Sequence, residues 1–241
     1  MSMSSLRPVA VLASLALLAA CRGEGQGLEP APEKPPAGVG PALAALGPAP
    51  LAPLGAPVTA DAAFTYPERA YGLDHAAWAR QPAYGFAHGE AQGFTWRTEG
   101  DWRRLAERVG GGYRFFYYAP DRPHPFFVRD AAGGFAFDDA GRLVGVYDPK
   151  GALVPTPPEA PELAGRYLAH AANLAAAERE QRFSVAPAVW TAQAPLVFRS
   201  HAAARYAAQT DPEWRAWRIA TRGRDLALVL QDARLIRSAF V

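Results

Sequence analysis

The clearest pattern along the chain is a series of short apolar runs between residues 113 and 154. The runs are rich in aromatic and β-branched side chains, and they cover residues 113–119, 125–130, 134–138, 142–148 and 152–154. Turn-forming residues separate them; Asp148–Gly151, for example, reads Asp-Pro-Lys-Gly and suits a type I turn. Because strands joined by such short turns run antiparallel, the pattern predicts a β-meander of about four or five strands.

A helix is predicted upstream of this region, from residue 65. Thr65-x-x-Glu68 has the form of a capping box, and Tyr71 and Trp78 then fall on one helical face. The following stretch, residues 81–98, is interrupted by glycines, which places some of its aromatic rings on loops.

A second upstream helix is predicted over residues 101–109. Asp101 is a suitable N-cap, and Trp102, Leu105 and Val109 have the spacing of one helical face. Three glycines at residues 110–112 then end the helical pattern.

The chain is predicted to be mostly helical over residues 161–241. Apolar side chains at helical spacing, together with His170, predict a long helix that begins at Pro161. Residues 183–199 are apolar but contain Pro187 and Pro195, which predicts extended edge segments and loops there. Further helices are predicted over residues 200–209, 213–222 and 224–240.

These elements together predict one α+β domain over residues 61–241. Its centre is an aromatic-rich antiparallel β-meander, and its helices cover the sheet on one side. Half of the residues in the chain are hydrophobic, which is enough for a substantial core. The formal net charge of +2 gives no long-range field of the kind that attracts nucleic acid, so no nucleic-acid partner is expected.

Residues 21–60 differ from the domain, because Pro, Ala and Gly dominate them and aromatic residues are missing. Such a segment cannot bury enough apolar surface to offset the entropy of ordering it, so it predicts a disordered, semi-rigid tether. The alternative is that its leucines dock on the domain; they are Leu43, Leu46, Leu51 and Leu54.

The first twenty residues carry a short basic start and an uncharged run from Val9 to Ala20. This run is too short to span a membrane but matches the apolar part of a secretory signal peptide, so residues 1–20 are interpreted as one. It ends at Cys21, the only cysteine of the chain. A single cysteine left over in a secreted protein is unusual and needs an explanation.

The sequence Leu18-Ala19-Ala20-Cys21 resembles the lipobox of bacterial lipoprotein precursors. The resemblance implies cleavage before Cys21, lipidation of that residue and attachment to a membrane of the cell envelope through the lipid. Because Arg22 and not Asp follows the cysteine, the resemblance favours the periplasmic face of the outer membrane over the inner membrane. The mature domain would then contain no cysteine and form no disulfide.

Candidate catalytic residues are sparse. Two short sequences, Asp74-His75 and His88-Gly89-Glu90, place an acid beside a base, but neither spacing selects a reaction. No two of the five histidines have a metal-binding spacing, so neither a metal site nor a cofactor is predicted. His170 is expected to be a hydrogen-bonded core or interface residue, and Glu178 and Glu180 to form a solvated face.

The aromatic residues between 66 and 102 are the other candidates for a site. Exposed rings of Trp78, Tyr84 and Trp96 would stack on the sugar rings of an envelope glycan, whereas buried rings would simply fill the core. The sequence therefore predicts an envelope lipoprotein with a binding or structural role. Two alternatives remain, a glycan- or peptidoglycan-binding module, and an envelope hydrolase that uses the His, Asp and Glu residues between 74 and 90.

Overall fold

A computed structural model of the chain describes residues 46–78, 80–89 and 91–221, which all belong to one compact unit, Pro35–Val241. The predicted signal peptide, Cys21, the first part of the predicted tether and the helix expected at 224–240 lie outside the described residues, as does Glu90.

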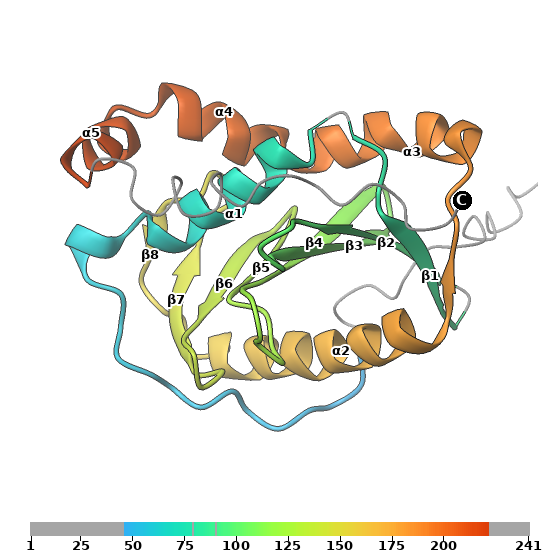
Figure 1. Cartoon of the computed structure of the whole chain (residues 1–241). Helices are drawn as coiled ribbons and strands as arrows, with labels where there is room; N and C mark the ends of the chain where they lie inside the picture. Colours follow the sequence, from blue (N-terminus) through green and yellow to red (C-terminus); the bar gives the residue numbers. More distant parts are fainter. Residues whose placement is uncertain (1–45, 79, 90, 222–241) are drawn as a thin grey trace, which may run out of the picture. The chain divides into compact units, whose positions relative to one another are not determined.

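Nine strands in the described part of the chain form one antiparallel sheet, ordered β8-β7-β6-β5-β4-β3-β2-β1-β9 (Figure 1). The strands are β1 Tyr84–His88, β2 Ala91–Arg97, β3 Arg103–Val109, β4 Gly112–Tyr118, β5 Phe127–Asp130, β6 Gly133–Phe137, β7 Leu143–Tyr147, β8 Leu153–Val154 and β9 Arg182–Phe183. Each of the first seven strands pairs with the next along the chain, and β9 returns to pair with β1. The predicted meander over residues 113–154 is therefore confirmed, and it extends further upstream than expected.

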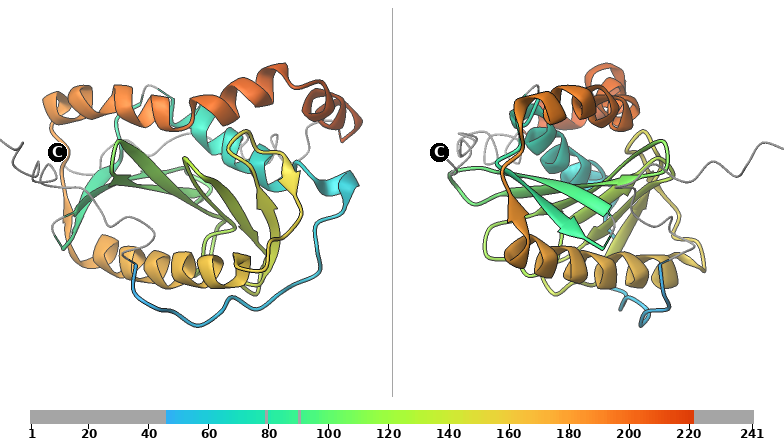
Figure 2. Two further views of the ribbon diagram at one scale, coloured as in Figure 1. Left: turned by 180° about the vertical axis from the view of Figure 1, so that it is seen from behind. Right: turned by 90° about the vertical axis from the view of Figure 1, so that its right-hand side faces the viewer.

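Helices cover both faces of this sheet, as Figure 2 shows, so the prediction of a one-sided cover was wrong while the α+β class is confirmed. They are α1 Thr65–Ala76, α2 Ala160–Glu180, α3 Pro187–Ser200, α4 Ala202–Thr210 and α5 Pro212–Ala220, with a short 3₁₀ helix, η2, at Ala60–Ala62. No helix among those described combines the length and the apolar character that crossing a membrane requires.

The sheet separates two apolar cores, and alternate strand residues point into each of them. In β4, Phe115 and Tyr117 pack toward α1 and α3, whereas Phe116 and Tyr118 pack toward α2. All four side chains are buried. Because each large aromatic ring removes an area of about 150–250 Å² from water, this strand contributes strongly to the stability of both layers.

Residues 103–109 form strand β3 and not the helix predicted there. Four consecutive residues, Arg104 to Glu107, are buried, because both faces of the sheet are covered. The apolar spacing of Trp102, Leu105 and Val109 is compatible with either structure. Three of the charged residues between them, Arg103, Arg104 and Glu107, form ion pairs or hydrogen bonds inside the protein. Asp101 does not cap a helix; it has a positive φ of 60° at the turn before the strand.

Residues 187–200 form helix α3, which corrects the prediction of extended segments and loops. Pro187 lies in the first turn, where its missing N–H is not needed. Pro195 lies inside the helix, which typically costs about 3 kcal/mol. Burial of Trp190 and Val197 against the sheet offsets that cost.

The segment from residue 46 onward packs against the domain, so the prediction of a disordered tether does not hold for its second half. The N–H of Ala52 donates to Pro161 at the start of α2, and the N–H of Gly55 donates to Leu143 in β7. The alternative of docking through leucine side chains agrees with Leu46, which is buried, but is wrong for Leu51 and Leu54, which are exposed. Leu43 lies outside the described residues. Backbone hydrogen bonds hold this segment and cover the part of β7 that β8 leaves unpaired.

The capping box predicted at the start of α1 does not form. Glu68 is buried and accepts hydrogen bonds from Trp214 and Arg218, so it joins α1 to α5. The N-cap of α5 is Asp211, whose carboxylate accepts from the N–H groups of Glu213 and Trp214.

Candidate functional site

The three rings proposed to bind a glycan do not form one surface. Trp96 is 2% exposed in the core beneath α3, and Tyr84 is 6% exposed on the opposite side of the sheet. Trp78 is 37% exposed, but its ring packs against Phe198 and lies under the guanidinium of Arg205. The exposure that glycan binding requires therefore fails for Tyr84 and Trp96, and only Trp78 of the three is partly exposed.

The residues proposed for a hydrolase are separated by the sheet. Asp74 points from α1 into one core, whereas His88 lies on β1 and faces α2 on the other side. His75 is exposed on α1, where its ring stacks on Tyr71. These three residues do not line a common cleft.

Asp74 instead forms a buried ion-pair network that joins α1 to the sheet. Its carboxylate lies 2.8 Å from a guanidinium nitrogen of Arg104 and 2.7 Å from one of Arg129, and Tyr117 donates to it from 3.1 Å. Burial alone would raise the pKa of Asp74. The positive charges of Arg129 and Arg104 outweigh that effect and hold the pKa well below its usual range.

A second ion pair joins the C-terminal end of α2 to the sheet and corrects the prediction for Glu178. Glu178 is buried, not solvated, and its carboxylate accepts from Arg103 at 2.7 Å and from the Tyr84 hydroxyl at 2.5 Å. Burial, together with the neighbouring carboxylate, raises the pKa of Tyr84 to about 12. Glu180 is exposed, as predicted.

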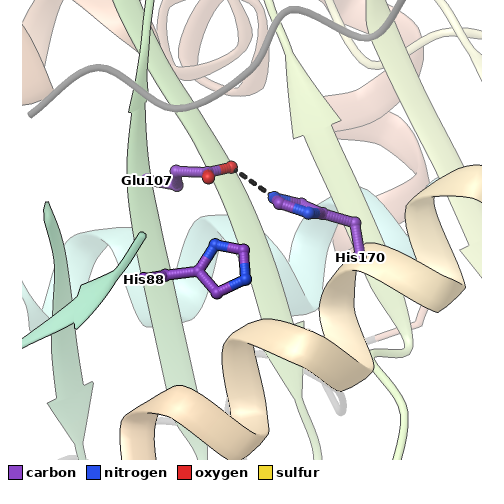
Figure 3. Close-up of side chains that lie close together, drawn as sticks. All are labelled: His88, Glu107 and His170. Atoms are coloured by element: carbon purple, nitrogen blue, oxygen red, sulfur yellow. Dashed lines mark hydrogen bonds and ion pairs between the residues drawn. The ribbon is translucent and has the colours of Figure 1, made fainter. Parts of the chain in front are cut away.

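The group of side chains best suited to bind a ligand is a cluster of His88, Glu107 and His170, shown in Figure 3. The three side chains converge from β1, β3 and α2, and one ligand atom from each lies within 4.8 Å of the others. His170 Nε2 lies 2.7 Å from Glu107 Oε2, which confirms the prediction of a hydrogen-bonded core histidine. The sequence predicted no metal site, because these residues have no recognisable spacing.

The surroundings of this cluster favour a neutral imidazole at His88. Glu107 and His170 are buried, at 1% and 5% exposure, while His88 is half-buried. Burial lowers the pKa of His88, and the neighbouring His170 lowers it further. Arg114 contacts the same carboxylate oxygen as His170, with a guanidinium nitrogen 3.4 Å from Glu107 Oε2.

A separate cavity of about 630 Å³ lies where β4 meets α3 and α4. Arg199 and Ser200 are among its polar lining residues. The hydroxyl of Ser200 accepts from the N–H of Tyr113 and donates to the carbonyl of Leu196, so it is not poised as a nucleophile. His201 turns away and is buried against Phe115 and Phe198.

Comparison with protein-family models, with curated proteins and with solved structures found no match for this chain.

Proposed function

We propose that this chain is a lipid-anchored protein of the bacterial cell envelope, held at the membrane through Cys21, whose folded domain has a binding or structural role. The observation that carries the proposal is the sequence Leu18-Ala19-Ala20-Cys21 at the end of an apolar run. A buried acyl chain contributes about 0.8 kcal/mol per methylene, and two or more chains give stable anchoring.

The packing of the segment from residue 46 onward limits the distance between the domain and the anchoring membrane. Residues 22–45 are the 24 residues that separate Cys21 from the packed segment. A chain of that length spans at most roughly 85 Å at full extension. We therefore propose that the partners of the domain lie close to the anchoring membrane and include envelope proteins.

The two alternatives carry less support than this reading. Glycan stacking needs several exposed rings on one surface, and two of the three candidate rings are buried. Hydrolysis by residues between 74 and 90 needs an acid and a base in one cleft, and the sheet separates Asp74 from His88.

Cell fractionation tests the anchor. The full chain should sediment with membranes, resist extraction by high salt and dissolve in detergent. The Cys21→Ala variant should lose that association. A wild-type protein found in the soluble fraction would refute the proposal.

The membrane preference is tested separately with an Arg22→Asp variant. By resemblance to lipoprotein sorting, the wild-type protein should fractionate with the outer membrane and the variant with the inner membrane. If the two proteins fractionate identically, the outer-membrane preference inferred from Arg22 is wrong, although the lipid anchor itself would still stand.

A further inference from the structure

We propose that His88, Glu107 and His170 form a binding site for a divalent transition-metal cation, with Zn²⁺ as the best-matched ion. The inference goes beyond the lipid anchor and does not depend on it. It rests on the convergence of three ligand types from three elements, β1, β3 and α2, onto one point between the sheet and the helix (Figure 3).

The donor set suits such an ion. Two imidazole nitrogens and one carboxylate oxygen are a common protein ligand set for Zn²⁺, with bonds of about 2.0–2.2 Å. Ligand atoms around a tetrahedral ion of that size lie roughly 3.3 Å apart. Here His170 Nε2 and Glu107 Oε2 are 2.7 Å apart, and all three ligand atoms lie within 4.8 Å of one another. Binding would require side-chain rotations that bring these atoms to roughly 3.3 Å from one another.

The second oxygen of Glu107 gives an independent reason to expect a ligand. Oε1 is buried and has no hydrogen-bond partner among the described residues. A buried acceptor without a partner typically costs about 1–3 kcal/mol, and a cation that Oε1 also contacts would remove that cost.

Arg114 has a defined part in this arrangement. With its nitrogen 3.4 Å from Glu107 Oε2, it orients the carboxylate from outside the ligand set. Its positive charge also opposes that of the ion. We therefore expect an affinity in the micromolar range and not the much tighter binding of a closed structural site.

One ligand of the site is partly accessible to solvent. His88 is half-buried and is followed by the exposed Gly89, whereas the other two ligands are buried. Three protein ligands leave a fourth position for water or for an external ligand, as in sites where zinc is not purely structural.

A titration of the full chain, purified without a polyhistidine tag and stripped with a chelator, tests the proposal. Zn²⁺ is measured by equilibrium dialysis, and Co²⁺ is used as a second probe because its visible spectrum reports tetrahedral coordination. We expect one equivalent of each ion. His88→Ala and His170→Ala should weaken binding by more than about 100-fold, since changes even outside a ligand set cost 10–100-fold.

Two control variants test whether the ion binds to a histidine or a thiol outside the proposed site. His124→Ala removes a histidine from the β4–β5 connection and should bind as the wild type does, and Cys21→Ala should do the same because no thiol is used. Absence of binding, an aqueous-type Co²⁺ spectrum, or equal binding by His88→Ala would overturn the proposal. If His170→Ala fails to fold, the half-buried His88 decides the question alone.

Discussion

At the scale of single residues, several charged side chains are buried and compensate one another. Asp74 is buried, and its charge is compensated by Arg104 and Arg129 and by a hydrogen bond from Tyr117. Removing one member of such a group leaves the others buried and uncompensated, which costs more than the group contributes as a whole.

Replacement of Asp74 by Asn should therefore destabilise the protein by about 3–5 kcal/mol, because two buried guanidiniums lose their counter-charge. Urea unfolding at neutral pH measures the change. The matched control is Asp139→Asn, which breaks an exposed ion pair with Arg122 and should cost less than about 1 kcal/mol. Equal effects of the two variants would contradict this account.

The same pairing sets a pH dependence. Since the pKa of Asp74 is lower in the folded protein than its ordinary value of 3.8, its stabilising effect is complete above that value and is lost as pH falls toward the folded pKa. The Asp74→Asn variant should accordingly lose less stability than the wild type when the pH is lowered below about 4.

His201 predicts a separate loss of stability at mildly acidic pH. Burial lowers its pKa from 6.5 to about 4, Asp74 opposes the shift, and Arg104, Arg129 and Arg205 add to it. The unfolded chain binds a proton first, so stability should fall by about 3 kcal/mol as pH drops from 6.5 to about 4. Urea unfolding across that range should show a smaller pH dependence for His201→Phe.

The control for this prediction is His75→Gln, which replaces an exposed histidine on α1. It should keep the pH dependence of the wild type. If His201→Phe and the wild type lose stability in parallel, the assignment of the acid effect to His201 is wrong.

At the scale of elements, the sequence predicted those whose signals are local. The strands after residue 112 were predicted because turn residues separate them, and α2 because its apolar stripe is long. The errors at β3 and α3 have one physical cause, namely a sheet covered on both faces. Because both sides of β3 are buried, its sequence lacks the alternation of apolar and polar residues that identifies a strand. Packing of α3 against the sheet stabilises the helix enough to accommodate Pro195 in its interior.

The contact between α2 and the segment 46–59 gives an element-scale prediction. A Cβ at Gly165 would clash with the carbonyl oxygen of Pro50. Although Gly to Ala usually stabilises a helix by about 1 kcal/mol, Gly165→Ala should destabilise this protein by about 1–3 kcal/mol. Hydrogen exchange should show faster exchange at Ala52 and Gly55.

The control is Gly111→Ala, where an added Cβ meets nothing within 4 Å. It should leave exchange in the segment 46–59 unchanged. A Gly165→Ala variant that is more stable than the wild type, with unaltered exchange, would show that the segment does not pack on α2 as described.

At the scale of the whole molecule, the candidate metal site depends on arrangements that no local pattern encodes. Glu107 reaches His170 only because β3 is a strand with its α2-facing side fixed by pairing with β4, and His88 joins them through the register of β1. The sequence identified His88 and His170 individually, but it placed residue 107 on a helix and so could not bring the three together.

The anchor is the central claim about the whole molecule, and the intact mass of protein purified from membranes tests it most directly. We expect a chain that begins at Cys21 and carries the added mass of two or three acyl chains, and a Cys21→Ala variant that carries none. An unmodified Cys21 in a protein cut near residue 20 would contradict the account and indicate ordinary secretion.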